Sequence, residues 1–186
     1  QGAGAAAGGG SAEVDIEDLR EAARERIMQW EMRSVGEGTD PNDISTLTPQ
    51  ELAEGIASGT VFAVDVREAE ERRGWQFPGA TTYASFLDVK MRPFDIGTVL
   101  SRFRKDRRPL VAISTSGERC RLYGAMLIDI FDFQLDRVLR LEGGMRAWHR
   151  WEEGNPKMSR CLRDMFGLGP LSAGREDGPG SPRLLA

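Results

Sequence analysis

The residues best suited to chemistry lie in one short segment, 114–119, which reads Ser-Thr-Ser-Gly-Glu-Arg. The apolar run at 110–113 is typical of a buried strand, and the pattern from residue 121 onward is typical of a helix. A glycine-containing loop between a strand and a helix turns its backbone N–H groups toward one point, at the positive end of the helix dipole. The segment therefore predicts an anion-binding loop, of the kind on which several enzyme families place a nucleophile.

Strand and helix patterns alternate through residues 45–153, and this part of the chain must position the loop. We expect helices at 49–58, 95–103, 121–131 and 145–151, strands at 61–66, 110–113 and 136–141, and a short extended segment at 82–84. Such alternation predicts an α/β fold, a parallel β-sheet flanked by helices on both faces. Ligands of these sheets bind at the carboxyl ends of the strands, where Asp65, Arg67, the loop and residues 142–144 would meet.

Two extensions flank this region. Residues 1–44 include an apolar stripe with helical spacing, so we expect an amphipathic helix at about 15–33, with Asp15 as its N-cap. That helix either packs on its own domain or docks on a partner protein. Residues 154–186 are rich in Gly, Pro and Ser and show no period, which predicts an extended tail. Met158, Leu162, Met165 and Phe166 could form one docking turn within it.

Composition limits the function classes. The 186 residues carry a formal net charge of −4, which gives no reason to expect nucleic acid binding. No apolar run is long enough for a membrane span. Two cysteines, Cys120 and Cys161, do not make a disulfide scaffold, so we expect free thiols in a reducing intracellular compartment. The first residue is not Met, which either a cleaved targeting peptide or a trimmed chain would explain; a mitochondrial protein fits the former.

Three segments together resemble one family. Asp65-Val-Arg67-Glu68 with Phe-Pro-Gly-Ala at 77–80, the loop at 114–119, and Leu-Glu-Gly-Gly-Met-Arg-Ala-Trp at 141–148 resemble, in order and spacing, the motifs of rhodanese-like domains. The resemblance covers residues 45–153. It implies a rhodanese-like fold and a loop in which backbone N–H groups and the arginine, here Arg119, stabilise negative charge.

The family's first loop residue is a cysteine that carries sulfur as a persulfide, and this chain has Ser114 there. A serine oxygen cannot form a persulfide, and a serine hydroxyl has no accessible anion at neutral pH without an activating base. The one histidine, His149, follows the last glycine turn, where we expect a packing or surface role. Gln76 is a second departure, because the family often has histidine there.

Other groups of the loop leave alternatives open. Cys120 is the fallback thiol: it either packs the helix onto the sheet, facing away from the loop centre, or reacts with a pKa lowered by the helix N-terminus. Arg119 either binds an anion or forms an ion pair with Asp65 or Glu68. The residues expected around an anion are Ser114, Thr115, Ser116, Gly117 and Arg119, with Glu118 pointing outward and Asp65 and Arg67 in support.

Three functions remain. The first is a catalytically inactive rhodanese-like protein, a structural or interaction subunit of a larger assembly that binds protein partners through residues 1–44 and 154–186. The second is a sulfurtransferase that uses Cys120. The third is a regulatory module that binds an anion or a phosphopeptide in the loop. None of the three implies a metal or a cofactor.

Overall fold

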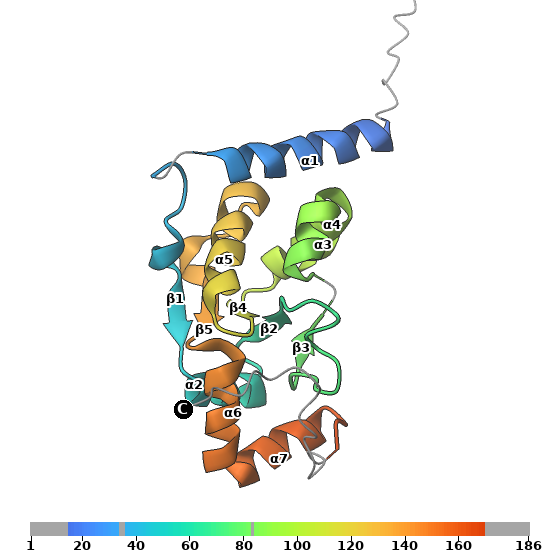
Figure 1. Ribbon diagram of the computed structural model, residues 1–186. Coiled ribbons are helices and arrows are strands. Elements are labelled where there is room, and N and C mark those ends of the chain that lie inside the picture. The colour runs from blue at the N-terminus through green and yellow to red at the C-terminus, as the bar shows by residue number, and fades with distance from the viewer. Residues whose placement is uncertain (1–14, 34–35, 83, 170–186) are drawn as a thin grey trace, which may run out of the picture.

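A computed structural model describes residues 15–33, 36–82 and 84–169 (Figure 1). One parallel sheet of five strands, in the order β1-β5-β4-β2-β3, forms its centre. The strands are β1 Ser45–Leu47, β2 Phe62–Asp65, β3 Ala80–Thr81, β4 Leu110–Ile113 and β5 Val138–Leu141. The α-helices are α1 Ile16–Met32, α2 Pro49–Ser58, α3 Phe86–Met91, α4 Pro93–Lys105, α5 Glu118–Phe131, α6 Gly144–Gly154 and α7 Pro156–Met165. Short 3-10 helices are η1 Pro41–Asp43 and η2 Leu135–Arg137.

Helices cover both faces of the sheet, as the alternation of elements predicts. In the central strands, successive side chains point to opposite faces. On one face, Leu110 and Ala112 of β4 pack in a core with buried residues of α3, α4 and α5. On the other, Val111 and Ile113 pack with buried residues of α2, α6 and α7. β4 is therefore buried on both sides, and it holds the loop that follows it in a fixed position.

The bounds of some elements agree with the prediction and those of others do not. Helix α2 begins with the predicted capping box, in which Thr48 and Glu51 bond each other's backbone N–H, and ends at Gly59 with φ +68°. Helices α4 and α6 are each longer than the predicted 95–103 and 145–151. Strands β1 and β3 and helix α3 were not predicted at these positions, because each is too short to show a period.

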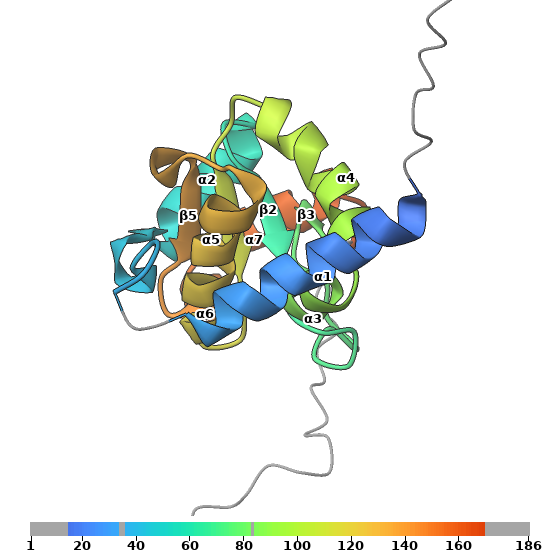
Figure 2. The ribbon, with the colours of Figure 1, turned by 90° about the horizontal axis from the view of Figure 1, so that it is seen from above.

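The N-terminal helix α1 crosses the outside of the α3–α4–α5 layer (Figures 1 and 2). Asp15 is its N-cap, as predicted, and accepts a hydrogen bond from Glu17 N–H at 2.9 Å. Ile27 is buried against the domain, and Trp30 Nε1 donates to Asp129 Oδ2 of α5 at 2.8 Å. The described part of the N-terminal extension is thus packed on its own domain, although Ile16 and Leu19 of the predicted apolar stripe stay exposed.

The C-terminal extension differs from the prediction. Residues 156–165 form helix α7 rather than an extended tail, and Leu162 is fully buried against the sheet face that α2 and α6 cover. The apolar residues Met158, Leu162 and Met165 have helical spacing, but most of the residues around them are polar, so the segment was predicted as one turn within a tail. The prediction for 170–186 lies outside the described residues.

Candidate functional site: a closed loop around Ser114

Ser114 begins the loop directly after β4, at the carboxyl edge of the sheet. The chain reverses there and enters α5 through Gly117, which is the N-cap and has φ +88°. Gly117 fits because residues with a Cβ rarely adopt this conformation. The predicted order of strand, loop and helix is therefore present, and it brings Ser114 to the amino end of α5.

The hydroxyl of Ser114 lies inside the loop and faces two donors. Its Oγ accepts the backbone N–H of Gly117 at 3.2 Å and the thiol of Cys120 at 3.0 Å. Only 1% of the Ser114 surface is exposed. In the described part of the chain, no carboxylate or imidazole contacts this oxygen that could take its proton. The hydroxyl is thus positioned as a nucleophile would be, but it has no activating base.

Cys120 packs in the core between α5 and the sheet, as one of the two alternatives predicted, but it does not face away from the loop centre. Its side chain points back to the loop centre, where it contacts Ser114, rather than away from it. It is fully buried in the core beside α5. Burial raises the pKa of the thiol to about 12, although the contact with Ser114 and the positive charge of Arg140 act in the opposite direction. The expectation that the helix N-terminus would lower this pKa is therefore wrong, because desolvation outweighs it.

The turn at Gly143 and Gly144 packs against the loop that begins at Ser114. Met145 N–H donates to the carbonyl of Ser114 at 2.9 Å, and Arg146 N–H to that of Thr115 at 3.4 Å. A Cβ on Gly144, which has φ +58°, would lie 2.4 Å from Ser114 O. Gly144 is thus needed for the close approach of the two loops, whereas a Cβ on Gly143 would meet Ala147 of α6 at 2.8 Å.

Glu71 was not among the predicted site residues, yet it binds the outer groups of the loop. Its carboxylate accepts from Thr115 Oγ1 at 2.7 Å, from Arg119 Nη1 at 2.6 Å and from Glu68 N–H at 2.9 Å. Partial burial raises the pKa of Glu71, but these hydrogen bonds outweigh it and bring the pKa down to about 2. Its position in the charged turn after Arg67 was the available sequence signal.

Arg119 is therefore in an ion pair, but with neither of the two partners expected. Asp65 instead binds Arg67, which donates to both carboxylate oxygens, with Nη2 to Oδ2 at 2.7 Å. Both side chains of this pair are buried. Glu68 accepts from Ser85 Oγ and Leu87 N–H at the start of α3. The strand ends thus meet as predicted, and their charges are paired in a different combination.

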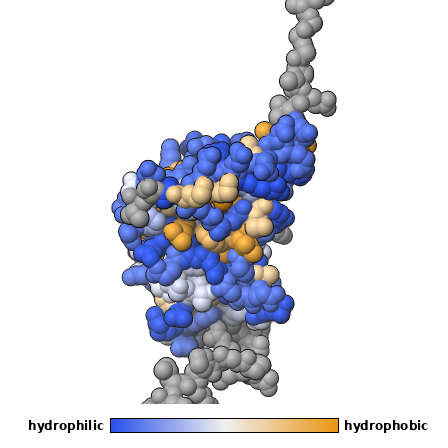
Figure 3. Space-filling view, turned by 45° about the horizontal axis from the view of Figure 1, so that its top comes forward, coloured by the Kyte–Doolittle hydropathy of each residue, from blue (hydrophilic) through white to orange (hydrophobic). Residues whose placement is uncertain are grey.

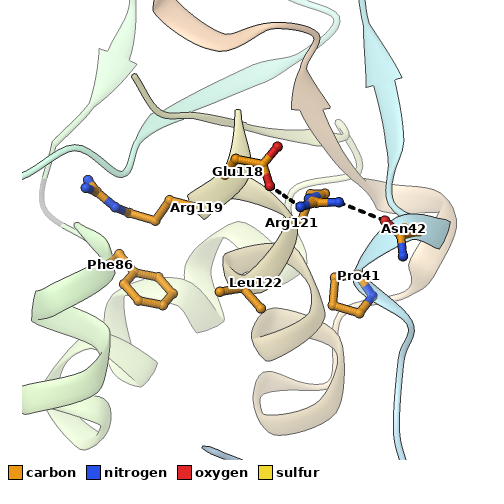
Figure 4. Close-up of a pocket in the computed structure, with 7 residues that line it drawn as sticks. All are labelled: Pro41, Asn42, Phe86, Glu118, Arg119, Arg121 and Leu122. Atoms are coloured by element: carbon orange, nitrogen blue, oxygen red, sulfur yellow. Dashed lines mark hydrogen bonds and ion pairs between the residues drawn. The ribbon is translucent and has the colours of Figure 1, made fainter. Parts of the chain in front are cut away.

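A hollow of about 480 Å³ lies beside the loop, at the outer surface of α5. It is lined by Pro41, Asn42, Phe86, Glu118, Arg119, Arg121 and Leu122 (Figure 4). Arg119 leaves α5 on the side opposite to Arg121, which binds Glu118 and Asn42 (Figure 4). Ser114, Thr115 and Ser116 do not line this hollow. The hollow and the loop centre are therefore separate features.

The remaining predicted candidates lie elsewhere. His149 Nδ1 is 3.0 Å from Glu152 Oε2, and its ring packs edge-on against Trp75. Gln76 is exposed, and Cys161 is a free, exposed thiol on α7. In the described ranges no group of three or more His, Cys, Asp or Glu side chains is arranged to hold a metal ion. Within the same ranges, no helix has both the length and the apolar character needed to cross a membrane.

The model of the rhodanese-like domain matches residues 48–150, more than half of the chain. No curated protein matches the sequence. A rhodanese-related protein from Thermoplasma volcanium has 14% identity and a TM-score of 0.43, over 57% of this chain and 92% of that chain.

A protein of unknown function from Rhodopseudomonas palustris, described as a possible tyrosine phosphatase, has 20% identity and a TM-score of 0.40. That match covers 70% of this chain and 89% of that one. The assignment rests on the match of the domain model, together with the parallel sheet and the loop between β4 and α5. The chain belongs to the rhodanese-like domain family.

Proposed function

We propose that this protein is a rhodanese-like protein without sulfurtransferase activity, which acts as a structural or interaction subunit of a larger protein assembly. The observation that carries the proposal is the closed environment of Ser114 Oγ. This oxygen stands at the position of the family's cysteine, and its two contacts, Gly117 N–H and the Cys120 thiol, are both donors. An oxygen held in this way neither gains a base nor accepts sulfur as a persulfide.

The burial of Cys120 argues against the first alternative, a sulfurtransferase that uses this thiol. A nucleophilic cysteine is a thiolate at working pH and is accessible to its substrate. Cys120 is fully buried, and its pKa is raised to about 12. At neutral pH it is therefore a neutral side chain of the core that supports Ser114.

The pairing of Arg119 argues against the second alternative, an anion- or phosphopeptide-binding module. The guanidinium that would hold the anion already binds the carboxylate of Glu71, and so does the hydroxyl of Thr115. A ligand at this position would have to displace an internal carboxylate that is ionised throughout the physiological pH range. In the wild-type loop the charge of Arg119 is thus already neutralised by Glu71.

The test is transfer of sulfur from thiosulfate to cyanide by the purified protein and two variants. We expect background turnover for the wild type. Ser114→Cys, reduced and then separated from the reductant so that it holds no disulfide with Cys120, should gain turnover, because a thiol would then face Gly117 N–H at the start of α5. Ser116→Cys is the matched control: it adds a thiol to the same loop at an exposed position, and we expect background turnover.

A second measurement separates the alternatives. After treatment with thiosulfate, mass spectrometry should find no persulfide on Cys120 of the wild type, whereas exposed Cys161 should react with iodoacetamide under native conditions. Robust wild-type turnover that disappears in Cys120→Ser would overturn the proposal and restore the enzyme hypothesis.

A further inference from the structure

An apolar surface spans three helices on the side of the molecule where α1 crosses the domain. Figure 3 shows apolar side chains gathered below α1 in that view. This surface, the α1–α3–α5 face, consists of Met28, Met32, Phe86, Leu87, Met91 and Leu122. Apart from half-buried Phe86, all of these are exposed, with Met91 at 62% and Leu122 at 47%. Soluble monomers rarely leave such a set of large apolar side chains together, so the face indicates a contact surface.

The face has a hollow with protruding side chains next to it. Phe86 and Leu122 line the hollow of about 480 Å³ at the start of α5 (Figure 4). Leu87 and Met91, one turn apart on α3, project into solvent beside it. Met28 and Met32 lie one turn apart on α1, and Met28 is also three residues from Glu31, which pairs with Lys90 of α3, so this pair of methionines borders α3. Each copy thus presents both an apolar recess and apolar side chains of the size that fills one.

The charges around this face are already neutralised within the chain. Lys90 pairs with Glu31, Arg92 with Asp88, Arg119 with Glu71, and Arg121 with Glu118. The border of the face therefore carries both signs in pairs. Such a border does not select a strongly acidic or strongly basic partner, and it does not repel an identical surface.

From these three observations we infer that the α1–α3–α5 face is a self-association surface, on which a second copy of this chain docks about a two-fold axis. A two-fold contact places the same patch on both partners, so that each recess receives the protruding residues of the other copy. A standard interface buries roughly 800 Å² per partner, and six half-buried or exposed Met, Leu and Phe side chains can supply a large part of that area. The inference is independent of the chemistry at Ser114.

Sedimentation velocity of the purified chain over a wide range of concentration tests the inference. We expect the wild type to shift from monomer to dimer with increasing concentration. Leu122→Glu should raise the dimer dissociation constant about a hundredfold or more, since it places a carboxylate in each recess, against the apolar side chains of the other copy. Met91→Ala, which adds no charge and keeps α3 helical, should raise it about tenfold.

Leu135→Glu is the matched control. Leu135 lies in η2, outside the face, and is 46% exposed, almost the same as Leu122. This variant should dimerise like the wild type, and unchanged far-ultraviolet circular dichroism should show that all variants fold. A wild type that stays monomeric at every concentration would overturn the inference, as would equal effects of Leu122→Glu and Leu135→Glu. A monomeric wild type would mean that a different protein, rather than a second copy, covers the face.

Discussion

Glu71 Oε2 lies 2.6 Å from Nη1 of Arg119, and this contact joins the turn after β2 to the first turn of α5. The two residues are 48 positions apart in the sequence. The same carboxylate also holds Thr115, so one side chain fixes two groups of the loop around Ser114. Two contacts therefore fix the loop: the side chain of Glu71 binds Thr115 and Arg119, and the segment after the glycine turn at 143–144 donates backbone hydrogen bonds to it.

The Glu71–Arg119 pair should make stability depend on pH. The folded carboxyl has a pKa of about 2, below the ordinary value of 4.5 for an unfolded chain. Its contribution is therefore fully present above pH 4.5 and is lost as the pH falls from 4.5 toward 2. We expect Glu71→Gln to lower the free energy of unfolding by about 1 kcal/mol at pH 7, because solvent screens the partly exposed pair. This difference should shrink toward pH 2 in urea titrations.

Glu70→Gln is the control for that series. Glu70 precedes Glu71 and pairs only locally with Arg73, and its side chain is 70% exposed. Its replacement leaves the contacts of Glu71 with the loop in place, so the loss expected of Glu71→Gln at pH 7 should not appear in it. Asp88 and Asp129 also have lowered pKa values, and comparison of matched variants cancels their effects. A Glu71→Gln difference that is the same at pH 7 and pH 2.5 would contradict the assignment.

A cysteine at position 114 should form a disulfide with Cys120. Cys120 Sγ lies 3.0 Å from Ser114 Oγ, so replacing that oxygen with sulfur places two sulfur atoms within bonding reach after a small shift. We expect a mild oxidant such as diamide to convert Ser114→Cys to a form 2 Da lighter, with the 114–120 pair identified by peptide mapping. Ser116→Cys should form no disulfide with Cys120. An equal yield of disulfide with Cys120 in both variants would contradict the contact between Ser114 and Cys120.

The sequence predicted the scaffold better than the contacts. Strand 110–113, the part of the predicted strand 136–141 from residue 138 onward, and the cap at Thr48 were accessible because an apolar run or a capping pattern acts locally. The partner of Arg119 was not: Glu68, Glu70 and Glu71 lie in one charged turn, and only the folded turn decides which carboxylate reaches the loop. The orientation of Cys120 was not accessible either, because it depends on the residue at which α5 begins.

The C-terminal helix was missed for a related reason. Met158, Leu162 and Met165 of α7 do lie at helical spacing, but Leu162 is the one fully buried apolar side chain among them, and the charged residues and glycines around the segment outweighed this short signal. Cation–π contact of Arg163 with Trp75 and the hydrogen bond of Ser159 to Glu152 supply the other contacts. Such polar contacts between distant elements cannot be read from a single sequence, so the burial of this helix against the domain was not predictable.

Gly144→Ala should displace the loop. The added Cβ would lie 2.4 Å from Ser114 O and 2.6 Å from Gly117 N, both backbone atoms that cannot move away independently. We expect a loss of about 3 kcal/mol or more in the free energy of unfolding, as is typical of a steric clash combined with a positive φ. Gly59→Ala is the control, because Gly59 has φ +68° but nothing within 4 Å of its Cβ position. It should cost about 1 kcal/mol, and equal losses would show that strain alone, not the contact with Ser114, requires Gly144.

Two Asp-x-Arg pairs in this chain have the same local geometry and differ in burial, which allows a direct comparison. Arg67 binds Asp65 and Arg108 binds Asp106 through both Nε and Nη2, but only the first pair is buried. We expect Asp65→Asn to cost about 3 kcal/mol, because it leaves the Arg67 charge buried without a counter-ion. Asp106→Asn should cost at most about 1 kcal/mol, since water solvates Arg108. Urea unfolding at neutral pH measures both, and similar losses would show that the buried pair at the end of β2 does not anchor this edge of the sheet.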